Sequence, residues 1–270
     1  MHRFFVTDDP AGVPELAAGD AVDLLETDAQ HVARVLRLRA GERIVLCDGR
    51  GSDYEAVLVA VHPSRTVAHV VQRRPSRGEP PLTVTLLQGV PKGEKMDLIV
   101  QKAVEVGVGR IVPVFTSRTV VEWDAAKAQA RRRRWQRIAY EAAKQCGRGR
   151  VPVVECPVSW EELWRTEHES LGRVLLPWEE ETSVGLRAVA RALSPGPVAI
   201  AIGPEGGFDP AEVEMARARG AQPVTLGPRV LRTETAGLVA ASILLYEWGD
   251  LGGPEAPSSG PPRPQASGSC

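Results

Sequence analysis

The sequence predicts an α/β protein in which a small β-barrel precedes a larger domain built on a mostly parallel sheet. Before residue 75, short β-like runs are separated by turn sequences such as "CDGRGS" and "HPSR". Short strands with hairpin turns are typical of a small barrel. After residue 81, nearly all-apolar strands alternate with helical segments, a pattern that indicates a parallel sheet covered on both faces.

The first part contains five β-like runs, "RFFV", "AVDLL", "RIVLC", "YEAVLVAV" and "VAHVVQ", and one helix-like insert, "DAQHVARVLRL". The stretch "RRPSRGEPP" at residues 73–81 follows. We predict a linker there, because consecutive prolines cannot join a central strand or a helix interior.

In the second part, "KMDLIVQKAVEVG" has helical apolar spacing and ends at Gly107, and a long helix is predicted from about Ala125 to Gln145. The end of the chain, "GGPEAPSSGPPRPQASGSC", is too rich in Pro, Gly and Ser to fold. We therefore divide the chain into a barrel (1–74), an α/β domain (75–251) and a disordered tail (252–270).

The composition is that of a soluble globular protein, with 43% hydrophobic and 25% charged residues among 270. No segment has the apolar length of a membrane span, and the start lacks a secretory pattern. We expect a cytoplasmic protein. The four cysteines form no CxxC pair and the five histidines form no ligand group, so neither a disulfide framework nor a metal site is predicted.

Positive charge is concentrated in one segment, although the net charge is only −1. Residues 125–150 hold nine Lys or Arg and one Glu. Segregated charge of this kind gives a local field that attracts phosphates. A solvated helix face is the alternative.

A glycine-rich loop follows an apolar strand in "VAIAIGPEGGFDPAEVE". Asp209, Pro210 and Glu212 predict a capping box that starts a helix, and Gly203, Gly206 and Gly207 would let the backbone turn with positive φ. The loop matches neither the P-loop nor the GxGxxG spacing. It is either a structural turn or a ligand loop at the carboxyl edge of the sheet.

Two more loops have the same form. In "LGPRVLRTETAGL" a strand end is followed by Gly-Pro, a short irregular run and a helix, for which Thr233 is the predicted N-cap. The third loop begins at Leu176 and Pro177, in "VLLPWEE". Three such loops at one sheet edge predict an apolar pocket with many backbone donors and acceptors, suited to adenine.

At these residues the sequence resembles the bacterial 16S rRNA (uracil(1498)-N3)-methyltransferase family. "IGPEGGF" and "LGPRVLRTETA" carry the resemblance, with "KGEKMDLIVQKAVEVGV", "QCGRGRVP" and "HVARVLRL" before them, from about residue 3 to residue 251. This family belongs to the SPOUT superfamily of S-adenosylmethionine-dependent enzymes. The resemblance implies a PUA-like, RNA-binding barrel, a SPOUT α/β domain with a knot over roughly residues 195–248, and a homodimer paired through the knotted region.

The resemblance also implies the site residues. Cofactor contacts are expected from the three loops, at Leu176, Pro177, Ile202, Gly203, Glu205, Gly206, Leu226, Gly227, Val230, Leu231 and Thr233. Arg232 and Glu234 lie beside the expected methyl site. Because uracil N3 must lose its proton before it attacks, we assign Glu234 to accept or orient that proton and Arg232 to offset the negative charge. In the alternative, Glu234 only complements the helix dipole and Arg232 contacts a phosphate.

Basic residues on outward helix faces are the candidate contacts for 16S rRNA in the small ribosomal subunit. They are His31, Arg34 and Arg37 in the insert, Lys92 and Lys95 after the first α/β strand, and Arg133, Arg137, Lys144, Arg148 and Arg150 in and after the long helix. Two other functions stay open: an RNA 2′-O-ribose methyltransferase, and an RNA-binding assembly factor without catalysis.

Overall fold

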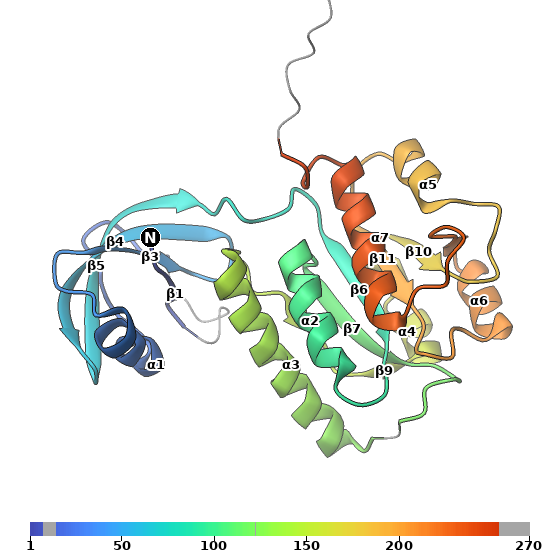
Figure 1. Ribbon diagram of the computed structural model, residues 1–270, viewed down its shortest axis with the longest axis horizontal. Coiled ribbons are helices and arrows are strands. Elements are labelled where there is room, and N and C mark those ends of the chain that lie inside the picture. Colours follow the sequence, from blue (N-terminus) through green and yellow to red (C-terminus); the bar gives the residue numbers. More distant parts are fainter. Residues whose placement is uncertain (8–14, 122, 254–270) are drawn as a thin grey trace, which may run out of the picture.

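The computed structural model describes residues 1–7, 15–121 and 123–253. It consists of an N-terminal sheet and a larger α/β part, joined by an extended connection and by helix α3 (Ala125–Cys146) (Figure 1). The predicted tail lies outside the described residues from residue 254 onward. None of the described helices combines the length and apolarity that crossing a membrane requires.

The N-terminal part is a five-stranded sheet in the order β1-β3-β4-β5-β2. All five predicted runs form strands: β1 (Arg3–Phe5), β2 (Ala21–Asp23), β3 (Arg43–Cys47), β4 (Ser52–His62) and β5 (Arg65–Pro75). β1 pairs with β3 in parallel, and the other pairs are antiparallel. A core that includes Phe4, Leu46 and Tyr54 lies inside the curved sheet.

The helical insert differs from a regular α-helix. A short helix α1 (Glu26–Gln30) continues as a π-helix (His31–Leu36). The following residue, Arg37, has φ 53° and is the one non-glycine residue with positive φ in the described ranges. Ala29 and Val32 are buried on the inner side of this insert.

The predicted linker begins too early. β5 continues through Arg73 and Arg74 to Pro75, because these residues pair with the long strand β4, where Ser52 lies opposite Pro75. Proline is tolerated here because it ends the strand, where no further ladder hydrogen bond is needed. The connection to the second part therefore spans residues 76–83.

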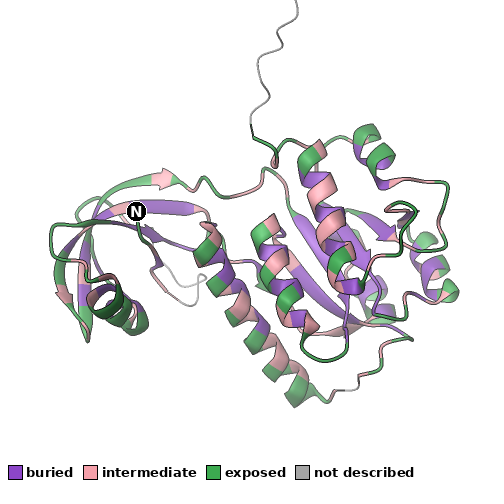
Figure 2. Cartoon of the chain, in the orientation of Figure 1, coloured by how far each residue is buried: buried purple, intermediate pink, exposed green. Residues whose placement is uncertain are grey.

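The second part is a parallel sheet in the order β12-β10-β11-β6-β7-β8, with β9 also paired to β7. Its strands are β6 (Val84–Gly89), β7 (Arg110–Phe115), β8 (Val153–Val154), β9 (Val158–Ser159), β10 (Arg173–Pro177), β11 (Val198–Ile202) and β12 (Gln222–Val224). Every pairing in this sheet is parallel, and the strands are largely buried (Figure 2). The predicted sheet type is confirmed.

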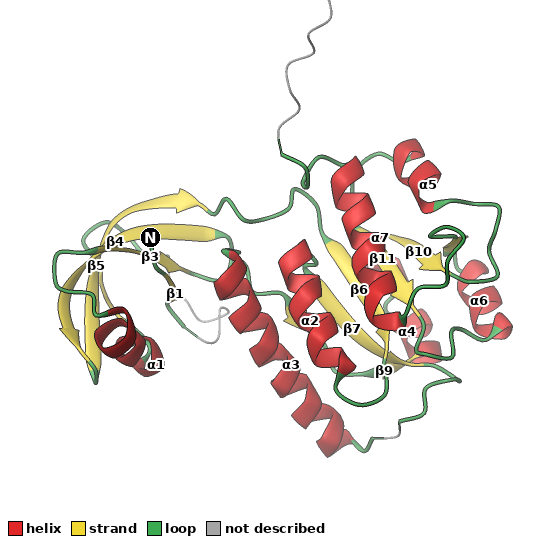
Figure 3. Cartoon of the chain, in the orientation of Figure 1, coloured by secondary structure: helices red, strands yellow, loops and turns green. Residues whose placement is uncertain are grey.

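Helices cover both faces of this sheet (Figure 3). One apolar core joins the sheet to α3, α2 (Lys95–Val106), α5 (Leu186–Ala192) and α7 (Thr233–Glu247). A second core joins the opposite face to α4 (Trp160–Thr166) and α6 (Pro210–Arg217). Burial of the strands from both sides explains why they read as continuous apolar runs.

The helix ends test the predicted caps. Gly107 ends α2 with φ 118°, and Asp209 and Glu212 form the capping box of α6. The prediction that Thr233 caps α7 is wrong. Arg232 occupies the N-cap position without a side-chain cap, and the Thr233 hydroxyl instead donates to the carbonyl of Gly203 at 2.7 Å.

Helix α3 joins the two parts. The ring of Tyr140 lies 5.0 Å from that of Phe5 in β1, and Lys144 forms an ion pair with the buried Asp28 of α1. The long helix is therefore not only a basic surface but also the support of the N-terminal sheet.

The last helix crosses the sheet. β12 lies at one edge beside β10, whereas α7 packs back across β11 and β6. The segment between them passes beside the loop after β11, where Thr233 meets Gly203. This crossing suits the predicted knot, which itself stays a prediction.

Candidate active site

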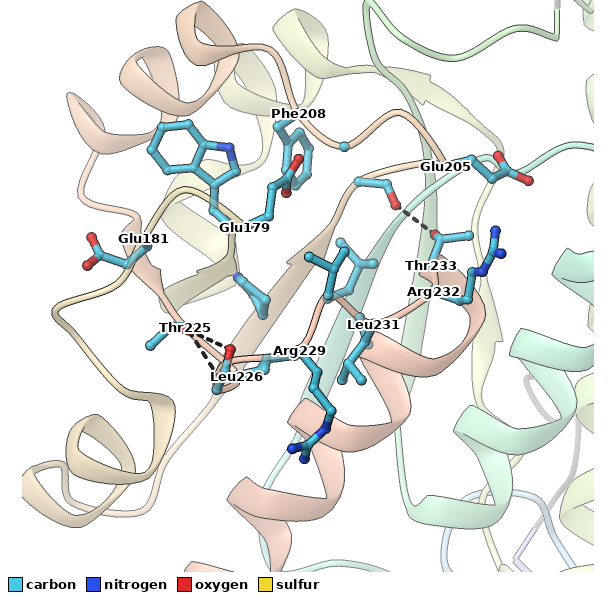
Figure 4. Close-up of a pocket in the computed structure, with 18 of the residues that line it drawn as sticks. Glu179, Glu181, Glu205, Phe208, Thr225, Leu226, Arg229, Leu231, Arg232 and Thr233 are labelled. Atoms are coloured by element: carbon cyan, nitrogen blue, oxygen red, sulfur yellow. Dashed lines mark hydrogen bonds between the residues drawn. The ribbon is translucent and has the colours of Figure 1, made fainter.

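Three loops meet around one cavity at the carboxyl edge of the sheet (Figure 4). They follow β10, β11 and β12, and because these strands are parallel their carboxyl ends lie at the same edge. The cavity has a volume of about 380 Å³, and Pro177, Gly203 and Leu231 all line it. The predicted meeting of the three loops is confirmed.

The loop after β11 depends on glycine at two positions for different reasons. Gly207 has φ 69°, a conformation that other residues rarely adopt. Gly203 has no positive φ, but a Cβ on it would lie 2.8 Å from the carbonyl carbon of Gly207. The expectation of positive φ is thus correct only for Gly207. Gly203 is needed for close packing of the loop on itself.

The loop after β12 forms another wall. Its residues from Thr225 to Arg232 line the cavity, and Gly227 turns the backbone with φ 113°. Val230 is 85% exposed at the rim. Beyond the loop, Thr233 accepts a hydrogen bond from Gln88 Nε2 at 2.9 Å, which ties the start of α7 to the end of β6.

The loop after β10 is held by Glu181. This carboxylate accepts hydrogen bonds from the hydroxyl and backbone N–H of Ser183 and from the N–H of Val184. These bonds, first that of the Ser183 hydroxyl, lower the pKa of Glu181. Glu181 is thus engaged in shaping the loop.

An ion-pair group lies where β6 and β11 end. Lys95 Nζ is 3.0 Å from Glu205 Oε1 and 3.5 Å from Glu234 Oε2. The Glu205 carboxylate also accepts from the backbone N–H of Lys92 at 3.1 Å. Partial burial opposes ionisation of Glu205, but these hydrogen bonds outweigh it and lower its pKa. The hydrogen bond to Glu205 raises the pKa of Lys95.

Most of the expected cofactor residues line the cavity. These are Pro177, Ile202, Gly203, Glu205, Leu226, Gly227, Val230, Leu231 and Thr233. The remaining two expected residues, Leu176 and Gly206, are not among those that line it. The Leu176 side chain is buried in the core on the opposite face of β10, because side chains alternate along a strand. Gly206 lies outside the lining, and its carbonyl accepts from Arg118 at 2.9 Å.

The two candidate catalytic residues differ in position. Arg232 lines the cavity and is exposed, and its side chain has no hydrogen bond or ion pair among the described residues. Glu234 lies in the first turn of α7, outside the lining, with its side chain 25% exposed beside Lys95. Arg232 is the N-cap residue of α7, so the two residues stand where the loop after β12 meets the helix.

The expected RNA contacts separate into two groups. His31, Arg34, Arg37, Lys92, Arg133, Arg137 and Arg150 are exposed. Lys95 and Lys144 are engaged in ion pairs within the protein. Arg148 is only 4% exposed, so the expectation that it faces RNA is wrong. It pairs with Glu79 at 3.0 Å and donates to the carbonyl of Val108.

Sequence reasoning missed several residues of the site. Trp178, Phe208 and Arg229 line the cavity, and the first and last are sequence neighbours of predicted residues. Arg118 comes from the loop after β7, a fourth parallel strand ending at this edge, and it reaches Gly206 and Asp209. The rule that loops at one sheet edge converge would have found it. Gln88 supports the site through its hydrogen bond to Thr233. Nothing in the sequence indicated this role, because Gln88 lies buried within an otherwise apolar strand.

The cavity fits a nucleoside of moderate size. Its volume falls within the range of small-molecule sites. Pro177, Ile202 and Leu226 supply apolar surface, and Gly203, Gly207 and Gly227 in the lining have no side chain to cover their backbone groups. In the described ranges, no group of three or more His, Cys, Asp and Glu side chains has the arrangement of a metal site.

Comparisons with known proteins agree with this site. A family model of an RNA methyltransferase domain matches residues 78–245, and one of an RNA methyltransferase PUA domain matches residues 24–67. Ribosomal RNA small subunit methyltransferase E of Bacillus subtilis is 31% identical over 252 residues, covering 92% of this chain and 97% of the relative. Its counterpart in Mycobacterium tuberculosis is 34% identical, covering 87% and 90%.

Solved structures agree as well. The same-named enzyme of Neisseria gonorrhoeae, bound to S-adenosylmethionine, has a TM-score of 0.81 at 34% identity, covering 93% of this chain and 99% of the other. A protein of Legionella pneumophila in complex with the same cofactor has a TM-score of 0.74 at 33% identity, covering 90% and 96%. The chain belongs to the ribosomal RNA small subunit methyltransferase E family, with a PUA domain followed by an RNA methyltransferase domain.

Proposed function

We propose that this protein transfers a methyl group from S-adenosylmethionine to N3 of a uracil in 16S rRNA of the small ribosomal subunit. One observation carries the proposal: the three loops form a nucleoside-sized cavity that Arg232 lines, and Glu234 lies in the first turn of the helix that follows Arg232. Relatives named as small-subunit rRNA methyltransferases support the substrate class. A ribosomal substrate places the enzyme in the cytoplasm.

The protein's part in the reaction is to position the base and to manage charge. The cofactor, when bound, supplies an electrophilic methyl group. The exposed Arg232 guanidinium can meet the uracil oxygens, where negative charge grows once N3 loses its proton. The Glu234 carboxylate accepts or orients that proton. Fixed alignment of the nitrogen with the methyl group supplies much of the rate.

Binding of the cofactor is assigned to the lining residues from Pro177, the loop after β11 and the loop Leu226–Leu231. Glu205 acts from the rim, because Lys92 and Lys95 hold its carboxylate. It therefore shapes the mouth of the cavity, and its backbone is the part available to a ligand.

The RNA-facing surface consists of two exposed groups. One lies on the N-terminal insert, at His31, Arg34 and Arg37, and the other on the long helix and beside it, at Lys92, Arg133, Arg137 and Arg150. Both contain guanidinium groups suited to phosphate. We further propose that two copies pair through the α/β domain, because α7 leaves half-exposed apolar side chains such as Val239 and the exposed Tyr246. Sedimentation of the purified protein tests this pairing.

Separate measurements on two variants test the catalytic assignment. We expect Glu234→Gln and Arg232→Ala to bind S-adenosylmethionine within about threefold of the unaltered protein, but to lose about 100-fold in methyl transfer. Calorimetry gives the first quantity and single-turnover transfer to small subunits lacking the modification gives the second. Unchanged turnover in both variants would remove the assignment.

A further inference from the structure

Three carboxylates line the cavity, and two of them are already engaged within the protein. Glu181 is bonded to Ser183 and Val184, and Glu205 to Lys92 and Lys95. The third, Glu179, has no hydrogen bond or ion pair among the residues that the structure describes. Glu179 is therefore the carboxylate free to meet a ligand.

The position of Glu179 is defined by its contact with the neighbouring loop. Its carboxylate lies so close to Gly207 that a Cβ on that glycine would collide with Oε1. Glu179 itself is exposed. The side chain thus extends from the loop after β10 toward the loop after β11 and remains exposed to solvent (Figure 4).

S-adenosylmethionine, the cofactor proposed above, has a flat aromatic base at one end and a charged amino-acid group at the other. Adenine requires apolar surface, which Ile202, Leu226 and Leu231 provide on other parts of the wall. The methionine end carries an ammonium group that stays well hydrated, so it suits the exposed side of the cavity. A charged hydrogen bond between ammonium and carboxylate is stronger than a neutral one.

We propose that Glu179 binds the α-ammonium group of the methionine part of S-adenosylmethionine. This inference rests on the cofactor site proposed above and adds a residue to it. Glu179 would hold the amino-acid end in place while Arg232 and Glu234 act at the other side of the methyl group. It would hold the product S-adenosylhomocysteine equally, because that molecule has the same ammonium group.

Three ligands distinguish the groups that Glu179 could contact. S-adenosylmethionine carries the sulfonium and the ammonium, S-adenosylhomocysteine keeps only the ammonium, and methylthioadenosine has neither but keeps the ribose. Each is titrated by calorimetry into the unaltered protein, Glu179→Gln and Glu180→Gln. Glu180 is the matched control, because it is exposed with the same charge and does not line the cavity.

We expect Glu179→Gln to weaken binding of S-adenosylmethionine and S-adenosylhomocysteine by about tenfold each and to leave methylthioadenosine unchanged. Glu180→Gln should leave all three unchanged. Weakening of methylthioadenosine as well would point to the ribose and overturn the proposal, and loss confined to S-adenosylmethionine would point to the sulfonium and do the same.

If Glu179→Gln and Glu180→Gln had equal effects, the cause would be the general loss of one negative charge. That result would contradict a specific contact of Glu179 with the ammonium group. Unchanged binding of all three ligands by Glu179→Gln would overturn the role of Glu179 while leaving the cofactor site intact. If the unaltered protein bound no S-adenosylmethionine, both this inference and the proposed function would fail.

Discussion

Gln88 donates from Nε2 to the hydroxyl oxygen of Thr233 at 2.9 Å, although 145 positions separate the two residues in the chain. The same hydroxyl donates to the carbonyl of Gly203 at 2.7 Å. Both side chains are buried. This short chain of hydrogen bonds joins the end of β6 to the loop after β11 and the first turn of α7, and Gly203 and Thr233 both line the cavity.

Replacement of Thr233 by Val should therefore harm both folding and cofactor binding. It removes the hydrogen bond to the Gly203 carbonyl and one of the two that Gln88 Nε2 donates, which costs about 1–3 kcal/mol in the free energy of unfolding. We expect weaker S-adenosylmethionine binding as the loop loosens. Thr233→Ser keeps the hydroxyl and serves as the control. Urea denaturation and calorimetry measure the two effects, and a Val variant indistinguishable from Ser would contradict the role of the hydroxyl.

Acid should loosen the mouth of the cavity through Glu205. Its pKa is lowered in the folded protein, because the hydrogen bonds from Lys95 and Lys92 outweigh partial burial. A depressed folded pKa means that the contribution is complete above the ordinary value of 4.5 and is lost as the pH falls through the folded pKa. We expect the affinity for S-adenosylmethionine to fall in that acid range, and to fall less in Glu205→Gln. An identical pH profile for both proteins would contradict this.

Arg148 should be required for stability and not for RNA binding. It is buried between Glu79 and the carbonyl of Val108. Glu79→Ala leaves this guanidinium buried without its partner, which costs about 3–5 kcal/mol in the free energy of unfolding. Arg173→Ala, on an exposed residue, is the control and should change little. Thermal and urea unfolding check the prediction, and a stable Glu79→Ala protein would refute it.

Arg137 should contribute to RNA binding while its helical neighbour Arg134 should contribute less. Arg137 is exposed with no hydrogen bond or ion pair among the described residues, whereas Arg134 is engaged with Asp97. We expect Arg137→Ala to reduce the slope of log affinity against log salt by about one. Filter binding of a 16S rRNA fragment at several salt concentrations measures the slope. A larger change in Arg134→Ala than in Arg137→Ala would reverse the assignment.

Arg37 combines backbone strain with an exposed charge. Its φ of 53° is costly for a residue with a Cβ. Arg37→Gly should therefore raise the free energy of unfolding by roughly 0.5–1 kcal/mol and weaken RNA binding. Arg39→Gly, at an exposed position without positive φ, should not stabilise. A destabilised Arg37→Gly protein would contradict the claim that the backbone of Arg37 is strained. Unchanged RNA affinity would contradict the claim that its side chain binds RNA.

The sequence predicts those parts of the fold that depend on a local pattern of apolar residues or on a local capping motif. The apolar runs from Val84 to Gly89 and from Val198 to Ile202 became the central parallel strands, and the capping box at Asp209 formed as its residues indicate. Predictions from neighbouring residues failed where a residue far away in the sequence determines the hydrogen bonding of a side chain. Thr233 has the composition of an N-cap, but Gly203 and Gln88 engage its hydroxyl.

The basic segment shows the same limit. Charge counting gives Arg148 and Arg137 equal weight, yet a carboxylate 69 positions away in sequence holds one and none holds the other among the described residues. Leu176 differs for another reason: it lies at the end of β10, where side chains alternate between the faces of the sheet, and its own side chain is part of the core. The sequence predicts that the three loops meet. Which of their side chains line the cavity depends on the three-dimensional structure.

Analysis of the modified nucleoside tests the central claim most directly. The purified protein is incubated with S-adenosylmethionine and small ribosomal subunits from cells lacking this enzyme, and the digested 16S rRNA is examined by mass spectrometry. Our account predicts one new 3-methyluridine, absent when Arg232→Ala replaces the unaltered protein. A methyl group on a ribose 2′-oxygen, or no transfer by a protein that binds the cofactor, would contradict it.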